Sequence, residues 1–264
     1  MKFNLGVAFL TFACTANFMR LLPDAAMVAI QHDVRAHYGW AYASDVDSAT
    51  SLRNTCNSHP DGQTLGWTAE QRKQTLETIV QRLHDSQHIV LVGAAAEEGD
   101  LERDWSENTV FIAADGAVGA CFDKVEVLCV VTDLDGGEHL DEAVRRQIPL
   151  VVHAHGDNRF RWEQCLTEWA KQGGPPLVLT HQTDECYPDM HNTGGFTDGD
   201  RAACLLAAVG VPFSRVRFIG YAVDHVGPWS GSTDPTRKLD KLRWMERILN
   251  HLHRGWADRD GLTS

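Results

Sequence analysis

Short apolar runs that alternate with helix-like segments are the feature that most constrains the fold of this chain. The runs, rich in Val, Ile and Leu, are Ile89–Val92, Thr109–Ala114, Val125–Val131, Pro149–Val152, Pro176–Leu179 and Val216–Tyr221. Helical patterns lie between or after them, at Glu138–Arg146, Arg159–Gln172, Asp200–Val209 and Thr236–His253. This alternation predicts an α/β fold, a Rossmann-like, mostly parallel sheet with helices on both faces.

The regular pattern begins near residue 67 and divides the chain into three parts. A capping box of Thr68 and Gln71 opens the first regular helix. A polar stretch with the turn signal Pro60-Asp61-Gly62 precedes it. We therefore predict a smaller, mixed helical and loop region over 1–66, an α/β catalytic domain over 67–254 and a C-terminal tail over 255–264.

The net charge indicates which partners the protein is poorly suited to bind, and the cysteines indicate its redox compartment. The chain has 36 acidic and 24 basic residues, a formal net charge of −12. This excess argues against nucleic acids, whose binding depends on Lys and Arg, and against anionic membrane surfaces. The seven cysteines include no CxxC pair, and apolar or periodic stretches contain Cys121, Cys129, Cys165 and Cys204. We expect buried free thiols in a reducing compartment, and hence a cytoplasmic protein.

A short apolar run, Leu5–Cys14, lies near the N-terminus. It is too short to span a bilayer, and no small-x-small cleavage site follows it as in a signal peptide. The favoured interpretation is a buried helix with Leu5, Phe9, Phe12 and Leu22 on its apolar face. An exposed face of this kind would support a homodimer.

Aspartates follow successive apolar runs at the point where each predicted strand ends. They are Asp115, Asp133 with Asp135, Asp157, and Asp198 with Asp200. Because ligands bind beyond the carboxyl ends of parallel strands, we expect these side chains to gather at one edge of the sheet. Asp133 and Asp135 would face the same side of an extended segment. Clustered carboxylates repel one another unless a cation lies among them, and such oxygen ligands suit Mg²⁺.

Groups suited to a phosphate lie beside these aspartates. Glycines such as Gly116 let a polyanion approach the backbone. The segment Thr197–Arg201 opens a helix whose free N–H groups and dipole favour an anion, and Arg201 can bond to phosphate. Lys238 and Lys241 lie one helical turn apart and add positive charge. The pattern predicts a Mg²⁺–nucleotide site and phosphoryl-type transfer.

Several of these residues have purely structural alternatives. Asp115 is also a common turn former. Asp198 and Asp200 could serve only as the N-cap and first-turn acids of a helix. Lys238 and Lys241 could belong to a solvated helix face. The sequence leaves these alternatives open.

Four segments resemble the signature blocks of archaeal 6-hydroxymethyl-7,8-dihydropterin diphosphokinases. They are ADGA at 114–117, VTDLDG at 131–136, HAHGDN at 153–158 and GFTDGDRA at 195–202, and the resemblance extends from about residue 89 to about residue 253. The ADGA and TDLDG pair also resembles blocks of thiamine pyrophosphokinases, whose catalytic domain is an α/β fold of this type. The region before Thr68 shows only a vague similarity, at 42–52, and we assign it no catalytic role.

The resemblance implies a Mg²⁺-dependent transferase that moves the β,γ-diphosphate of ATP to the hydroxymethyl group of a dihydropterin and releases AMP, in tetrahydromethanopterin or folate synthesis. ATP and the hydroxymethyldihydropterin are then the small-molecule partners. Mg²⁺ contacts are assigned to Asp115, Asp133, Asp135 and Asp157, of which Asp133, Asp135 and Asp157 are predicted to be catalytic. Nucleotide or substrate contacts are assigned to Gly93, Asp115, Gly116, Asn158, Thr197, Asp198, Asp200, Arg201 and Lys238.

One loop departs from the family pattern. A GxGPSL-like turn usually follows the first strand, whereas here three alanines and two glutamates follow Gly93. This change puts in question any phosphate or substrate contact made by the loop. Phe196 and Trp229 are the candidates for stacking on the pterin ring, because they neighbour predicted loops.

Three other functions remain open on the sequence alone. The first is a thiamine-type pyrophosphokinase. The second is a metal-dependent hydrolase in which His153 and His155 form a transition-metal pair, with His181 and Asp224 as further ligands. Alternatively, one histidine of the pair anchors a strand end and the other contacts the ligand. The third is a non-catalytic module that binds a pterin or a nucleotide.

Overall fold

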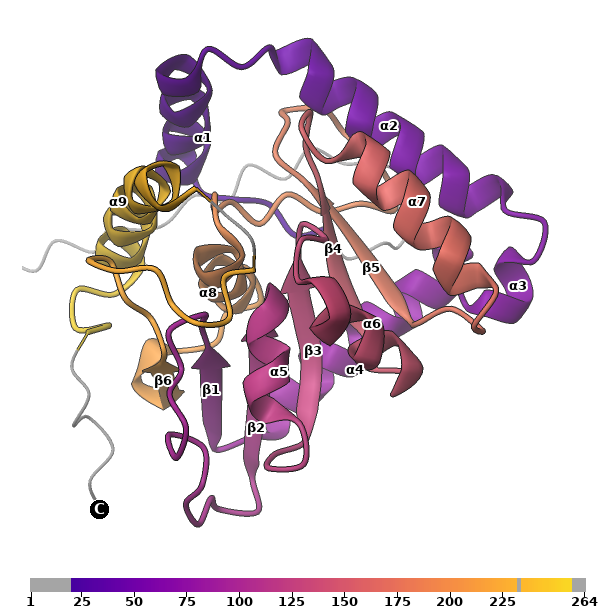
Figure 1. Ribbon diagram of the computed structural model, residues 1–264. Coiled ribbons are helices and arrows are strands. Elements are labelled where there is room, and N and C mark those ends of the chain that lie inside the picture. Colours follow the sequence, from indigo (N-terminus) through magenta and orange to yellow (C-terminus); the bar gives the residue numbers. More distant parts are fainter. Residues whose placement is uncertain (1–19, 232–233, 258–264) are drawn as a thin grey trace, which may run out of the picture.

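The computed structural model describes residues 20–231 and 234–257 (Figure 1). Six parallel strands form one sheet in the order β5-β4-β3-β2-β1-β6, which confirms the predicted α/β fold. The strands are β1 (His88–Val92), β2 (Thr109–Ala114), β3 (Val127–Thr132), β4 (Leu150–Ala154), β5 (Leu177–His181) and β6 (Val216–Ile219). Because β6 returns to the free side of β1, the strand order reverses there, and ligands commonly bind at such a reversal.

Helices cover both faces of the sheet (Figure 1). One face packs against α4 (Ala69–Asp85), α8 (Asp198–Ala208) and α9 (Pro235–Leu252). The other packs against α2 (Tyr42–Ser58), α3 (Gly62–Leu65), α5 (Val118–Cys121), α6 (Gly137–Arg145) and α7 (Arg159–Ala170). Strand side chains alternate between these layers, so that Val90 joins the second core and Leu91 the first. Two short 3-10 helices, η1 (Asp115–Ala117) and η2 (Phe213–Arg215), complete the described elements.

The ends of some strands and helices differ from the sequence prediction, because polar residues belong to these elements. β4 and β5 each run two residues beyond their predicted ends, because His153 and Thr180 pair in the ladder and are buried. The helix predicted from Asp200 begins at Asp198, since Thr197 provides a capping box one residue earlier. A prediction from apolar residues alone therefore makes the strands that lead into the polar edge of the sheet too short.

The predicted N-terminal apolar face is not borne out at Leu22, which lies outside any helix and is 46% exposed. Its other proposed members, Leu5, Phe9 and Phe12, lie outside the described residues. The first described helix is α1 (Ala25–Tyr38). It packs against α9, and α2 packs beside α7 (Figure 1). Both helices of this region thus contact the layers that cover the sheet.

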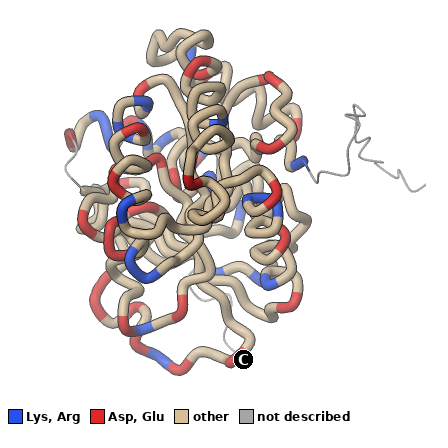
Figure 2. The backbone as a smooth tube through the Cα atoms, turned by 90° about the vertical axis from the view of Figure 1, so that its right-hand side faces the viewer, with Lys and Arg blue, Asp and Glu red and all other residues tan. Residues whose placement is uncertain are grey.

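The described cysteines are free thiols. Cys121, Cys129 and Cys204 are buried as predicted, and Cys165 is only partly buried. Burial raises the pKa of Cys129 to about 12, so this thiol stays protonated at neutral pH. Acidic and basic residues are both spread over the backbone (Figure 2). Within 20–231 and 234–257, no helix has the length and apolar character needed to cross a membrane.

Two buried histidines near the end of β5 should make stability depend on pH. Burial lowers the pKa of His181 to about 3 and that of His191 to about 4. Below about pH 6.5 the unfolded chain binds protons at these positions and the folded chain does not, so stability falls as the pH drops. We expect these two groups to lower the free energy of unfolding by about 3 kcal/mol between pH 7.5 and pH 5.5. Urea unfolding of the wild type and of His181→Gln tests this, because the variant should lose about half of that contribution. Equal pH dependence in both proteins would contradict it.

Candidate active site

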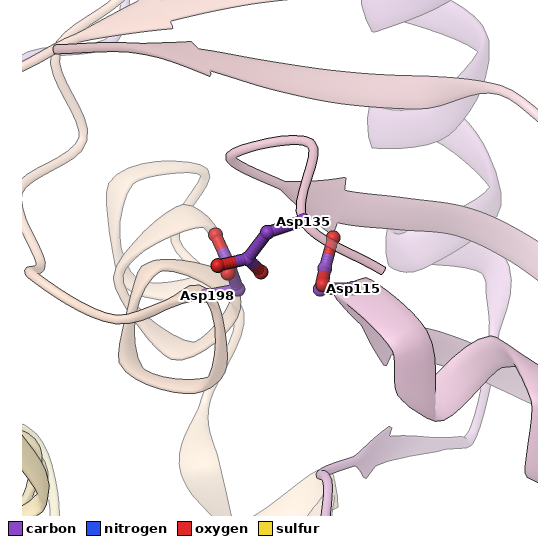
Figure 3. A group of neighbouring side chains, drawn as sticks. All are labelled: Asp115, Asp135 and Asp198. Atoms are coloured by element: carbon purple, nitrogen blue, oxygen red, sulfur yellow. The ribbon is translucent and has the colours of Figure 1, made fainter. Parts of the chain in front are cut away.

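Three carboxylates meet beyond the carboxyl ends of the central strands (Figure 3). Asp115 follows β2 directly, Asp135 lies in the turn after β3, and Asp198 is the first residue of α8. One oxygen from each lies within 4.8 Å of the others. Because an all-carboxylate oxygen set is what Mg²⁺ prefers, these residues fit that ion.

The electrostatics of this group also favour a cation. Burial raises the pKa of Asp115 well above its usual value, and the charges of Asp198 and Asp135 raise it further. Burial likewise raises the pKa of Asp198 to about 8, with Asp133 adding to the effect. Carboxylates that resist ionisation together are stabilised when a divalent cation lies between them.

Asp133 lies outside this group and belongs to an ionic chain in which Arg201 is buried and the other members are partly exposed. Its Oδ2 is 3.4 Å from His155 Nε2 and 3.5 Å from Arg201 Nη1. Arg201 Nη1 also lies 2.9 Å from Asp198 Oδ1. Burial opposes the charge of Asp133, but the hydrogen bond with His155 and the positive charges of His155, Arg201 and Lys241 hold its pKa well below the usual range. The chain His155–Asp133–Arg201–Asp198 thus connects the loop after β4 to the carboxylate group.

Asp157 is also separate from the three carboxylates. Its side chain is 52% exposed and lies 3.4 Å from Arg237 Nη2. The neighbouring Asn158 is buried and holds the loop in shape. Its amide donates to the carbonyl oxygens of His153 (2.6 Å) and Asp133 (3.1 Å), and its Oδ1 accepts from His155 N (3.0 Å). This arrangement gives Asn158 a positioning role between two strand ends.

The start of α8 combines a structural cap with a face open to ligand. Asp200 accepts from the backbone N–H groups of Phe196 and Thr197 and from the Thr197 hydroxyl. Its oxygens are thus used within the loop, which favours the capping alternative for Asp200. Thr197 and Asp198 line a cavity of about 60 Å³ beside the three carboxylates.

That cavity has a glycine-rich wall and one lysine. Its lining includes Gly93, Gly220 and Lys238. A Cβ at Gly93 would lie 2.5 Å from the carbonyl oxygen of Gly220, and one at Gly116 would lie 2.6 Å from that of Trp229. Glycine is needed at these positions because two backbones approach each other there.

The alanine loop after β1 is held by the loop after β6. Ala94 accepts a hydrogen bond from Trp229 N (3.0 Å), and Ala96 accepts one from Trp229 Nε1 (2.9 Å). The Trp229 ring also packs edge-on against His139, 5.0 Å away. Phe196, the other predicted stacking residue, is buried against Tyr38. Both aromatic rings therefore have packing partners within the protein.

Gly220 should be the most sensitive glycine of this contact. Its φ is +67°, and a Cβ there would lie 2.1 Å from Ala96 N. We expect Gly220→Ala to lower the free energy of unfolding by more than the roughly 1–2 kcal/mol of left-handed strain alone. Gly210 is the matched control, because its φ is +77° and no atom lies within 4 Å of its Cβ position. Thermal unfolding that shows equal losses for Gly220→Ala and Gly210→Ala would contradict the close approach.

The two histidines of the HxH segment do not converge on a common point. His153 Nδ1 lies 3.0 Å from the Thr180 hydroxyl and its Nε2 lies 3.3 Å from Gln182 Oε1. The His153 and His155 ring centroids are 6.1 Å apart. Among the residues that the structure describes, no cluster suited to a metal includes a histidine. Of the further ligands predicted for a hydrolase, His181 bonds to Thr183 and Asp224 is paired with His225 at the surface.

One residue of the site comes from the N-terminal region and was not predicted. Asp45 of α2 is buried and accepts from Gly156 N (2.8 Å) and from Gln182 Nε2 (2.9 Å). Arg35 Nη1 lies 3.5 Å from the same carboxylate. Asp45 therefore ties the loop after β4 to α2. The only sequence signal was the vague similarity at 42–52.

Comparisons with known proteins point to one family. No family model matches the chain. A Methanothermobacter thermautotrophicus protein named 6-hydroxymethyl-7,8-dihydropterin pyrophosphokinase is 34% identical over 171 residues, 60% of this chain and 67% of that protein. A Pyrococcus furiosus protein of the same name is 33% identical over 189 residues, 68% of this chain and 76% of that protein. A third, from Methanocaldococcus jannaschii, is 35% identical over 107 residues, 40% of this chain and 44% of that protein.

Proposed function

This chain belongs to the 6-hydroxymethyl-7,8-dihydropterin pyrophosphokinase family, and we propose that it transfers diphosphate from ATP to the hydroxymethyl group of 6-hydroxymethyl-7,8-dihydropterin. The observation that carries the proposal is the similarity to two relatives of that name, over 60% and 68% of the chain. The pterin diphosphate would then serve the synthesis of tetrahydromethanopterin or folate.

The carboxylate group supports a role for Mg²⁺ in this reaction. Asp115, Asp135 and Asp198 would hold the ion, because their oxygens already lie within 4.8 Å of one another. When bound, Mg²⁺ supplies positive charge that neutralises the phosphate oxygens. The predicted metal role of Asp133 stays a prediction: its Oδ2 pairs with Arg201 and His155, its Oδ1 has no hydrogen-bond partner among the described residues, and its low pKa makes it a poor base at neutral pH.

The protein's own groups would place the triphosphate at the mouth of the cavity beside these carboxylates. A cavity of about 60 Å³ is too narrow for a whole nucleotide. The N–H groups at the start of α8 and the ammonium of Lys238 would attract an anion there. Gly93 and Gly220 line the cavity, so that no side chain of these residues separates a phosphate from the backbone.

The transfer itself needs little acid–base chemistry from the protein. The hydroxymethyl oxygen forms a bond to the β-phosphorus, the bond from that phosphorus to the α,β-bridging oxygen breaks, and AMP leaves with the bridging oxygen. The hydroxyl proton passes to water. Positioning and charge stabilisation are then the main contributions of the site.

The acceptor dependence of AMP release tests this proposal. We expect AMP to form from ATP and Mg²⁺ when 6-hydroxymethyl-7,8-dihydropterin is present, and not when thiamine replaces it. AMP formed with thiamine alone would favour the thiamine-type enzyme. ATP left intact with the pterin at saturating Mg²⁺ would refute the proposal.

A further inference from the structure

A second cavity lies at His155, the end of the ionic chain that is farther from Asp198. It has a volume of about 180 Å³ and lies between the α1–α2 connection and the loop after β4. Its lining includes Trp40, Ser44, His155 and Asp157. An enclosed cavity of roughly 150 Å³ holds a benzene ring, so this open one accommodates a flat heterocycle that the 60 Å³ cavity does not.

Trp40 provides this cavity with a fixed aromatic wall. The indole stacks on Tyr38, with ring centroids 4.7 Å apart and planes 19° apart, and remains partly exposed. Phe196 supports it from 6.0 Å. A rigid, partly exposed indole binds a planar ring with little loss of conformational entropy.

Asp157 provides the cavity with a hydrogen-bond acceptor. Its carboxylate is half-exposed, and its one ion pair, with Arg237, is 3.4 Å long. The described carboxylates that could hold a metal do not include it. A 2-amino-4-oxo pyrimidine ring presents an amino group and a ring N–H on one edge, which are the donors that a carboxylate accepts.

The position of this cavity suits the acceptor of a two-substrate transfer. His155 lines it, and Asp198 lines the cavity beside the carboxylate group. Asp133 and Arg201 link these two residues through contacts of 3.4, 3.5 and 2.9 Å. A pterin ring in the second cavity would therefore have to extend its hydroxymethyl group past Asp133 to reach the nucleotide phosphates.

On the basis of the proposed function, we propose that the pterin ring binds in this second cavity, stacked on Trp40 and with its amino edge on Asp157. Helices α1 and α2 would then supply the acceptor site. This assignment replaces Phe196, which is buried, and Trp229, which lines the smaller cavity of about 60 Å³, as the residues that hold the ring.

A larger groove between α6 and α7 is the competing location. Its volume is about 740 Å³ and it also reaches Asp135. Its lining includes Glu138, Arg145 and Glu168, and its one tryptophan, Trp169, is 1% exposed. Its one partly exposed ring is the His139 imidazole, which packs against Trp229, and the charged lining disfavours the groove for a neutral, flat ring.

Binding and kinetics of Trp40 variants test the assignment. We expect Trp40→Ala to raise Kd and KM for 6-hydroxymethyl-7,8-dihydropterin by at least roughly ten-fold, from the lost stacking. KM for ATP should change by less than about two-fold, and Trp40→Phe should retain most of the affinity for the pterin.

Asp157→Asn, at an exposed position that folding tolerates, should also raise the pterin Kd and leave KM for ATP unchanged. Gln164→Ala, in the groove between α6 and α7, is the matched control and should change neither constant.

Equilibrium dialysis of the pterin without ATP separates this proposal from the proposed function. Wild-type protein that binds the pterin but forms no AMP would contradict the function and leave the site standing. Unchanged pterin Kd in both Trp40→Ala and Asp157→Asn, with AMP formed normally, would overturn the site alone. A loss of pterin affinity in Gln164→Ala would move the ring to the competing groove. Urea unfolding of each variant shows whether a loss reflects the fold.

Discussion

Replacing Asp135 by Asn should lower kcat/KM for ATP by roughly 10²- to 10³-fold, because a carboxylate that holds a divalent cation contributes several kcal/mol. The side chain is 49% exposed, so the fold should tolerate the change. We expect part of the activity to return as Mg²⁺ is raised, since the variant weakens the hold on the ion. Initial rates of AMP release over a Mg²⁺ titration measure both effects.

The matched control for this substitution is Asp224→Asn. Asp224 follows β6 at the same edge of the sheet, but it is 83% exposed and belongs to no carboxylate group. Its kcat/KM should stay within about two-fold of wild type, as expected for a surface change. Wild-type activity in Asp135→Asn at every Mg²⁺ concentration would remove Asp135 from the site.

Loss of Arg201 should have the largest effect on stability. The guanidinium is 4% exposed and lies between the carboxylates of Asp133 and Asp198. Arg201→Met leaves the ionised Asp133 with only His155 as an ion-pair partner among the described residues and removes a hydrogen bond from Asp198, which should lower the free energy of unfolding by about 3–5 kcal/mol. Urea unfolding at neutral pH, without Mg²⁺, measures the loss.

A double-mutant cycle shows whether the loss comes from the unpaired charge. Asp133→Asn removes one of the two carboxylates that Arg201 neutralises. The double variant Asp133→Asn/Arg201→Met should therefore be more stable than the sum of the single changes predicts, by about 0.5–3 kcal/mol. Strict additivity would mean that Arg201 and Asp133 do not interact.

The fold could be predicted because its signal is repeated along the chain. Each buried strand of a parallel sheet reads as an apolar run, and the helices between the runs show their own period. The ends of β4 and β5 could not be predicted from apolar runs. His153 and Thr180 are polar and yet buried, because each has a hydrogen-bond partner across the ladder.

The edge of the sheet at which the carboxylates gather could be predicted, but which of them lie closest together could not. Asp133 and Asp135 should share a side if the segment between them is extended. Leu134 instead has a φ of +79°, which turns the chain between them. Asp133 consequently faces His155 and Arg201, while Asp135 joins Asp115 and Asp198. A single backbone angle thus separates two residues that the spacing pairs.

The contacts of the N-terminal region with the loop after β4 could not be predicted from the sequence either. Trp40 and Asp45 reach the loop after β4, more than 100 residues further along the chain, only through tertiary packing. Their spacing carries no motif of a known site. The altered loop at Gly93 is also held by tertiary contacts, because its partners lie in the loop after β6.

Phosphorus-31 NMR of the reaction products distinguishes transfer of a diphosphate from other cleavages of ATP. With ATP, Mg²⁺ and 6-hydroxymethyl-7,8-dihydropterin, we expect equal amounts of AMP and of a diphosphate ester carrying both the β- and the γ-phosphorus. ADP and inorganic phosphate in their place, or ATP left unchanged, would contradict the proposed transfer.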